Sequence, residues 1–155
     1  MIIFKVADIF EKKSLDYAIV GGFAVALHGA VRGTVDLDLV LKLSRESFIL
    51  AEEALNSIGL VSRLPVKAGQ VFDFRQEYIQ NKNLIAWSFH NPDHPVEIVD
   101  IILTHDLAKL KTKKIKTGGR SLPVIAIEDL IAMKELSGRP QDKSDAEALR
   151  KLNHE

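Results

Sequence analysis

The sequence predicts a single α/β (α+β) domain in which helices flank a mixed β-sheet. Its 155 residues are enough for one domain, and 46% hydrophobic with 27% charged residues is typical of a folded globular chain. Segments with alternating apolar and polar residues are typical of strands, and they are interleaved with segments of helical apolar spacing. We expect the sheet within residues 14–127, followed by C-terminal helices within residues 128–153.

The first elements are a helix, a short strand and a small helix. Apolar residues three and four positions apart predict an amphipathic helix over residues 3–13. Residues 16–20 predict a short strand that runs into the glycine pair at 21–22. Residues 23–28 predict a small apolar helix that stops near Gly29.

The next elements are a turn at residues 32–34, a strand over 35–43 with period-two alternation, and a helix over 44–58. Ser44 is a suitable N-cap for that helix because its hydroxyl can accept a backbone N–H. Residues 60–78 have mixed polarity and predict only short strand pieces.

A pair of strands is expected at residues 83–89 and 96–103, because the linker at 91–95 has the Asn, Pro and Asp residues that favour a hairpin connection. The lysine-rich residues 111–116 are expected to be solvated, and residues 121–127 predict a further short strand.

Two helices are predicted in the C-terminal part of the sequence. The first spans residues 128–137 and is ended by Gly-Arg-Pro at 138–140. The second spans residues 144–152, where Ser144 and Glu147 have the spacing of a capping box.

Charge and composition exclude several classes of protein. Lys+Arg and Asp+Glu number 21 each, so the chain lacks the basic excess of a dedicated nucleic-acid-binding protein. The absence of cysteine excludes disulfides, zinc–thiolate sites and cysteine nucleophiles. We find no signal peptide and no apolar run long enough to span a bilayer. We therefore expect a cytoplasmic protein with no membrane partner.

The strand at residues 35–43 carries the most informative pattern. Its apolar face consists of Val35, Leu37, Leu39 and Leu41. Asp36 and Asp38 share the opposite face, roughly 7 Å apart, where their charges repel. The strand is either a surface strand with its polar face in water or one edge of a Mg²⁺ site, because Mg²⁺ prefers carboxylate and phosphate oxygens.

Asp100 is the candidate third carboxylate. It lies in a strand that is apolar on both faces, as a central strand is, where a lone aspartate is costly unless it is paired or bound to a metal. The alternative is an ion pair with a nearby basic side chain. Glu97 is a competitor, but it is nearer the start of the strand.

The glycine pair and the residues after it form a candidate phosphate site. Gly21 and Gly22 would let the backbone approach a ligand closely, or they simply make a tight strand–helix turn. Arg32, with Thr34 two residues later, is suited to bidentate phosphate contact. His28 is on an apolar helix, so it is either a ligand-binding residue or a half-buried histidine with a protein partner.

Two charged residues interrupt apolar faces of the C-terminal helices. Lys134 falls within the apolar stripe of its helix, where it either covers the core with its stem or reaches towards phosphates. Asp145 lies on the apolar side of the last helix, where it either favours the helix dipole or pairs with Lys134. Asp142 is also available as the acidic partner.

These motifs together resemble the pattern of the nucleotidyltransferase superfamily, whose fold is similar to that of DNA polymerase β. The pattern is Gly21-Gly22, thirteen residues, Asp36-Leu37-Asp38, and a later strand aspartate. The wider string and the C-terminal residues resemble the small AbiEii-toxin-related and MNT-type enzymes: Val20-Gly21-Gly22-Phe23-Ala24, His28-Gly29, Arg32-Gly33-Thr34-Val35-Asp36-Leu37-Asp38-Leu39, Lys134, Arg139, Asp142 and Asp145. Gly22 departs from the serine found in many members.

The resemblance implies a catalytic site built on three carboxylates. It implies that Asp36, Asp38 and Asp100 hold two Mg²⁺ ions, with Mn²⁺ as an alternative, and that Lys134 is catalytic. It also implies a set of residues that bind the NTP: Gly21, Gly22, His28, Arg32, Thr34 and Asp145. The expected reaction is two-metal transfer of an NMP to a hydroxyl, with release of pyrophosphate.

The acceptor and the partner are open at this stage. The resemblance implies the 3′ end of an RNA such as tRNA, or a Tyr, Ser or Thr hydroxyl of a protein, and a cognate toxin or antitoxin protein as a partner. The basic residues at 109–120 either flank an RNA acceptor or are a solvated surface. The alternative function is a non-catalytic module with this fold that acts through a protein partner. Tyr78, Trp87 and Phe89 are expected to fill the core rather than to stack on a base.

Overall fold

The computed structural model describes residues 1–30, 33 and 36–153. The strands, in chain order, are β1 (Ala18–Val20), β2 (Leu37–Val40), β3 (Val61–Ser62), β4 (Ala86–Asn91), β5 (His94–Ile102), β6 (Thr112–Thr117) and β7 (Arg120–Ile125). The helices are α1 (Ile2–Lys12), α2 (Gly21–Leu27), α3 (Arg45–Ser57), α4 (Ala68–Asp73), α5 (Arg75–Lys82), α6 (Ile127–Ser137) and α7 (Pro140–Asn153), with a 3₁₀ turn at Leu107–Lys109. This architecture confirms the predicted α/β class.

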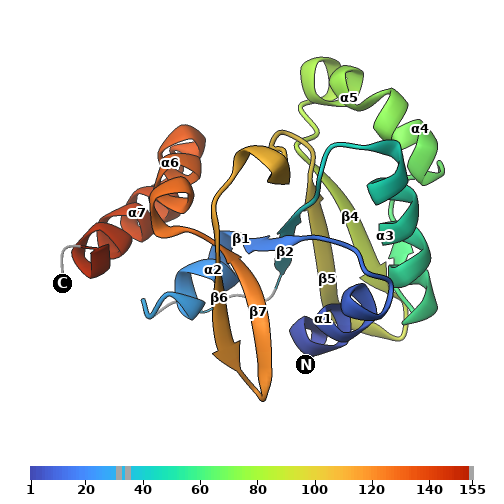
Figure 1. The fold of residues 1–155 in the computed structure, drawn as a ribbon. Coiled ribbons are helices and arrows are strands. Elements are labelled where there is room, and N and C mark those ends of the chain that lie inside the picture. The colour runs from blue at the N-terminus through green and yellow to red at the C-terminus, as the bar shows by residue number, and fades with distance from the viewer. Residues whose placement is uncertain (31–32, 34–35, 154–155) are drawn as a thin grey trace.

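The strands form one mixed sheet in the order β3-β4-β5-β2-β1-β7-β6 (Figure 1). The β2–β5 and β1–β7 pairs are parallel, and the other pairs are antiparallel. The expected hairpin is β4–β5. Its connection is shorter than the predicted linker at 91–95, because Asn91 and His94 are still paired. The parallel pairs bring segments distant in sequence to the centre of the sheet.

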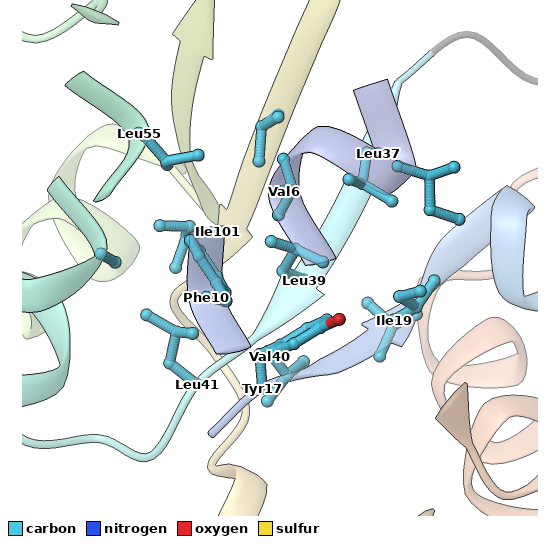
Figure 2. Close-up of a cluster of buried hydrophobic side chains, with 14 of the residues drawn as sticks. Val6, Phe10, Tyr17, Ile19, Leu37, Leu39, Val40, Leu41, Leu55 and Ile101 are labelled. Atoms are coloured by element: carbon cyan, nitrogen blue, oxygen red, sulfur yellow. The ribbon is translucent and has the colours of Figure 1, made fainter. Parts of the chain in front are cut away.

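One face of the sheet carries the main hydrophobic core. Leu39 of β2 is paired with Ile101 of β5, and both side chains are buried on that face. Helix α1 directs Val6 and Phe10 into the same cluster, and Leu55 of α3 closes it from the side (Figure 2). This packing explains why residues 35–43 alternate, since every second side chain must enter the core.

The aromatic side chains of β4 belong to this core, as predicted. Trp87 and Phe89 are fully buried, and the Trp87 ring stacks on that of Phe48 in α3 with centroids 5.8 Å apart. The Trp87 indole N–H donates to Ser62 Oγ at 2.8 Å. Tyr78 is half-buried against the same core.

The opposite face of the sheet is partly covered by a second group of helices. Helix α2 packs on β1, β2 and β7, α6 packs on α2, and α7 packs on α6. These three helices lie together on one side of the sheet, whereas α1 and α3 lie on the other (Figure 1).

Two local predictions were wrong. Residues 60–78 hold only the two-residue strand β3, followed by α4 and the start of α5 rather than further strand pieces. The last helix begins at Pro140, so Ser144 lies inside α7 and is no cap. Gly138 alone ends α6, in the left-handed conformation, and Pro140 opens the next helix because the first helical position needs no N–H donor.

The basic residues 111–116 are mostly exposed, as expected, but they also form strand β6 at the edge of the sheet. Lysines on an edge strand deter pairing with another chain. The N-cap prediction for Ser44 is confirmed, because its hydroxyl accepts the Ser47 N–H at 3.1 Å. No helix within the described residues is long and apolar enough to cross a membrane.

Candidate active site

The three aspartates singled out in the sequence come together across two strands. Asp38 of β2 is paired in register with Asp100 of β5 and, on its other side, with Val20 of β1. Paired residues direct their side chains to the same face, and the negative charge of Asp100 acts on the Asp38 carboxyl. Asp36, at the bend before β2, is close enough to interact electrostatically with both.

Burial and electrostatic repulsion raise the pKa of two of these carboxyls, those of Asp38 and Asp36. Desolvation, and then the negative charges of Asp100 and Asp36, raise the pKa of Asp38 to about 7, although the Lys134 ammonium opposes the shift. Desolvation and the Asp100 charge also raise the pKa of Asp36, against the opposing charge of Arg63. A bound cation would relieve this repulsion and displace the proton.

The donor set fits a divalent cation that also binds a substrate. Mg²⁺ is commonly held by one or two carboxylates together with phosphate oxygens, and Asp38 and Asp100 supply two carboxylates on neighbouring strands. Within residues 1–30, 33 and 36–153, no three acidic or histidine side chains form a complete ligand set by themselves. The remaining ligands would therefore come from the substrate and solvent.

Gly21 permits a close approach between the β1–α2 turn and Asp38. Its φ angle is +66°, in the left-handed region, and a Cβ atom there would overlap the Asp38 carboxyl group. Both constraints require glycine at this position. Gly22 is buried inside α2, so the nucleotide-binding roles expected of the two glycines remain predictions.

Lys134 of α6 is held by two carboxylates of α7. Its ammonium lies 3.2 Å from Asp142 Oδ1 and 3.1 Å from Asp145 Oδ2, and the exposed fractions of the three residues are 7%, 1% and 3%. Gln141 donates to the other Asp145 oxygen at 2.9 Å. The pairing expected of Lys134 is therefore present, and it involves both acidic candidates rather than one.

Arg139 binds the second oxygen of Asp142. Its Nε donates to Asp142 Oδ2 at 2.8 Å, while 75% of its side chain is exposed. Burial acts to raise the pKa of Asp142, but the hydrogen bonds from Arg139 and Lys134 outweigh burial and hold that pKa below its usual value. Two cations thus share an ionised, buried carboxylate beside the aspartates of the sheet.

A pocket of about 290 Å³ is lined by Asp38 of the sheet together with residues of α6 and α7. Its polar lining includes Asp38, Lys134 and Arg139. Its apolar lining is formed by Ile85, Ile102, Leu130, Met133 and Leu136. A pocket lined by both charged and apolar groups can hold a ligand that has a phosphate group and an apolar part.

A larger cavity of about 540 Å³ lies elsewhere, between α1 and the β6–β7 hairpin. It is lined by none of the site residues expected from the sequence, and the residue pair Asp8–Arg120 at its rim forms an ion pair at 2.7 Å. The convergence of carboxylates and cations, rather than volume, identifies the 290 Å³ pocket as the candidate site.

Of three further residues expected to bind nucleotide, the structure describes only His28. His28 Nε2 lies 2.7 Å from the Ile125 carbonyl oxygen, so the ring already has a protein partner that ties α2 to β7. Arg32 and Thr34 are outside the described residues. Their roles in nucleotide binding remain predictions.

Two residues at the site were not selected as site residues from the sequence. Ser88 Oγ donates to Asp100 Oδ1 at 2.5 Å, and Arg139 lines the pocket with Lys134. The signal for Ser88 was a small polar residue between Trp87 and Phe89, which directs it to the face opposite the core. Its alignment with Asp100 depends on strand register and had no local signal.

Comparisons with known proteins show what the fold is similar to. No protein-family model matches the chain. No curated protein matches it either. Among solved structures, the antibiotic-resistance factor ANT(2'')-Ia superposes with a TM-score of 0.64 at 16% identity, over 97% of this chain and 80% of that one.

Two further solved structures have the same arrangement. The lincosamide antibiotic adenylyltransferase LnuA gives a TM-score of 0.63 at 16% identity, over 97% of this chain and 96% of that chain. An antigenic nucleotidyltransferase-like protein from Paracoccidioides brasiliensis gives 0.58 at 18% identity, over 94% and 71%. Likeness at this level of identity concerns architecture alone. The chain thus has the fold of the nucleotidyltransferases.

Proposed function

We propose that the protein is a Mg²⁺-dependent nucleotidyltransferase that transfers an NMP from an NTP to an acceptor hydroxyl. The observation that carries the proposal is the in-register pair Asp38–Asp100, with Asp36 close enough to interact with both and Lys134 in the same pocket lining as Asp38. Carboxylates on rigid strands facing a buried cation are suited to holding metal-bound phosphates. The shared fold supports the same reaction class.

The proposed reaction is a displacement at phosphorus. The acceptor oxygen forms a bond to the α-phosphorus, the bond from that phosphorus to the α,β-bridging oxygen breaks, and pyrophosphate leaves. Asp100 takes the proton of the acceptor hydroxyl. Mg²⁺ or Mn²⁺ ions held by Asp36, Asp38 and Asp100 would supply Lewis-acid activation of the attacking oxygen and charge compensation for the leaving group.

Positive charge in the pocket would orient the triphosphate. Lys134 has a buried ammonium and lines the pocket together with Asp38, and Arg139 has an exposed guanidinium in the same lining. Asp142 and Asp145 fix Lys134 in place, so the role we propose for Asp145 in nucleotide binding acts through this lysine. The remaining proposed contacts to the nucleotide are Gly21, Gly22, His28, Arg32 and Thr34.

Two classes of acceptor are candidates: macromolecules and small molecules. An RNA 3′ end or a protein hydroxyl follows from the sequence resemblance, and the lysines of β6 are exposed. LnuA has been solved with lincomycin and ANT(2'')-Ia with adenylyl-2''-tobramycin, so a small-molecule hydroxyl is the rival acceptor. A cognate protein, as in toxin–antitoxin pairs, is part of the proposal for the macromolecular acceptors.

The test is label transfer from each α-labelled NTP, with ATP first, in the presence of Mg²⁺. Total RNA, a protein extract and an aminoglycoside–lincosamide mixture serve as separate acceptors. The inactive variant is Asp36→Asn/Asp38→Asn, and Asp16→Asn is the matched control because Asp16 forms an exposed ion pair with Lys42 away from the pocket.

Label that appears with the wild type and the Asp16 variant, but not with the double variant, establishes the activity and identifies the acceptor class. The absence of transfer to every acceptor, with a folded protein that binds NTP and Mg²⁺, would instead favour the alternative of a non-catalytic module that acts through a protein partner.

A further inference from the structure

Ser88 lies in line with the two central carboxyls of the site. On three adjacent strands, Ser88 of β4 pairs with Asp100 of β5, and Asp100 pairs with Asp38 of β2. Residues paired in this way share a face, so the hydroxyl and both carboxyls form one row across the sheet. The neighbours Trp87 and Phe89 are fully buried on the opposite face and fix the orientation of β4.

The Ser88 hydroxyl holds one oxygen of Asp100. Oγ donates to Asp100 Oδ1 at 2.5 Å, and the Ser88 carbonyl accepts the Arg63 N–H at 2.9 Å, which anchors this point of β4 from the other side. A hydroxyl has one proton to donate. With that proton directed at Oδ1, rotation of the Asp100 carboxyl group is restricted by a neighbour on a rigid strand.

This restraint matters because Asp100 faces other negative charges. Asp38 and Asp36 both interact electrostatically with it, and repulsion among ionised carboxylates favours turning one of them away. A hydrogen bond from a neutral donor stabilises the ionised carboxylate without adding a charge that would compete with a cation.

We propose that Ser88 is a positioning residue that fixes the Asp100 carboxylate in the orientation needed to bind a divalent cation with Asp38 and to accept the proton of the attacking hydroxyl. The inference rests on the proposed function, and it adds Ser88 to the three aspartates, Lys134 and Arg139. The competing explanation is that Ser88 only fills space between β4 and the pocket.

The test compares Ser88→Ala with Ser88→Thr. Threonine keeps the hydroxyl and is well suited to a strand, whereas alanine removes only the donor. Ser121→Ala is the matched control, because Ser121 is an exposed serine on another strand, β7. Mn²⁺ affinity is measured on the full chain by the paramagnetic signal of free Mn²⁺, and kcat and KM for the NTP are measured in parallel with thermal unfolding.

We expect Ser88→Ala to weaken Mn²⁺ binding about tenfold, as loss of a hydrogen bond to a metal ligand does, and to lower kcat more than it raises KM. Ser88→Thr is expected to restore both quantities, and the Ser121 variant to match the wild type. Unchanged Mn²⁺ affinity in a folded Ser88→Ala protein, or a threonine variant no better than alanine, would overturn the inference.

Failure of the proposed function is recognised separately. If the wild type binds Mn²⁺ but transfers no nucleotide to any acceptor, the reaction is wrong while the Ser88 effect on metal affinity still stands. If the wild type binds no Mn²⁺, the positioning role itself is overturned.

Discussion

Asp38 of β2 lies directly opposite Asp100 of β5 in a parallel ladder, so their carboxyl groups lie on the same face of the sheet. This arrangement is unfavourable when both groups are ionised, because the burial of Asp38 already penalises its charge. The fold therefore stores unfavourable electrostatic free energy at one point of the sheet. A proton or a cation bound to these carboxyls would release that free energy, and the resulting change in stability can be measured.

The first prediction concerns stability and pH. The pKa of Asp38 is about 7 in the folded protein against an ordinary value of 3.8, so between these values the folded state binds more protons than the unfolded state. Asp38 therefore contributes a fall in the free energy of unfolding as pH rises from about 4 to about 7. Asp38→Asn should remove most of that fall, on the order of 2 kcal/mol after solvent screening.

Denaturant unfolding at pH 5 and pH 7.5 measures this difference. The slope in the variant should be shallower but not zero, because the pKa of Asp36 is raised as well. Asp16→Asn, which alters an exposed ion pair, should keep the wild-type slope. An Asp38 variant whose stability still falls as steeply between these pH values would contradict the assignment.

The second prediction concerns metal addition. A divalent cation that binds only the folded state stabilises it by about 2.7 kcal/mol at a free concentration of about 100 Kd. Because protons compete with the cation for Asp38, Mg²⁺ or Mn²⁺ should raise the melting temperature more at pH 7.5 than at pH 5.5. The shift should vanish in Asp36→Asn/Asp38→Asn; an equal shift in that variant would place the binding site elsewhere.

Local patterns were sufficient for the parts of the site that lie on one element. Alternation placed Asp36 and Asp38 opposite the core-facing Leu37 and Leu39 because a strand has a strict period of two. Helical spacing likewise placed Lys134 among apolar neighbours. In both cases the signal is a charged residue where the period requires a defined face.

Parts that depend on strand pairing or on weak periodicity could not be predicted. The register of Asp38 with Asp100 is set between strands far apart in the chain, and Ser88 joins their row only through the further register of β4 on β5. Helix α5 was missed because none of its residues is buried, so it has no apolar stripe to detect. The start of α7 was misplaced because Pro140 was interpreted as a helix stop, whereas proline also suits the first helical turn.

The third prediction uses Gly21. Gly21→Ala combines a left-handed residue, which costs roughly 1–2 kcal/mol for a non-glycine side chain, with overlap between the new Cβ and the Asp38 carboxyl. Gly119→Ala is the matched control, because its φ of +76° imposes similar strain with no atom within 4 Å of the added Cβ. Both variants should lose stability in urea unfolding.

Only the Gly21 variant should also lose Mn²⁺ affinity, because only its Cβ displaces the Asp38 carboxyl. Equal metal affinity in the two alanine variants would show that the close approach of the β1–α2 turn to Asp38 has no bearing on the site.

The fourth prediction separates the structural role of Lys134 from its role towards phosphate. Lys134→Met leaves Asp142 and Asp145 buried without their shared ammonium, and breaking such a buried pair costs about 3–5 kcal/mol. Arg139 and Gln141 still contact one carboxylate each, which favours the lower end of that range. Urea unfolding gives the loss directly.

Adding Asp145→Asn to Lys134→Met removes one of the two stranded charges, so the double variant should recover part of the lost stability, and the double-mutant cycle gives the coupling between the two residues. Nucleotide binding should not recover with it, because the asparagine restores no positive charge to the pocket. A double variant that is stable and binds NTP as tightly as the wild type would show that Lys134 serves only to join α6 to α7.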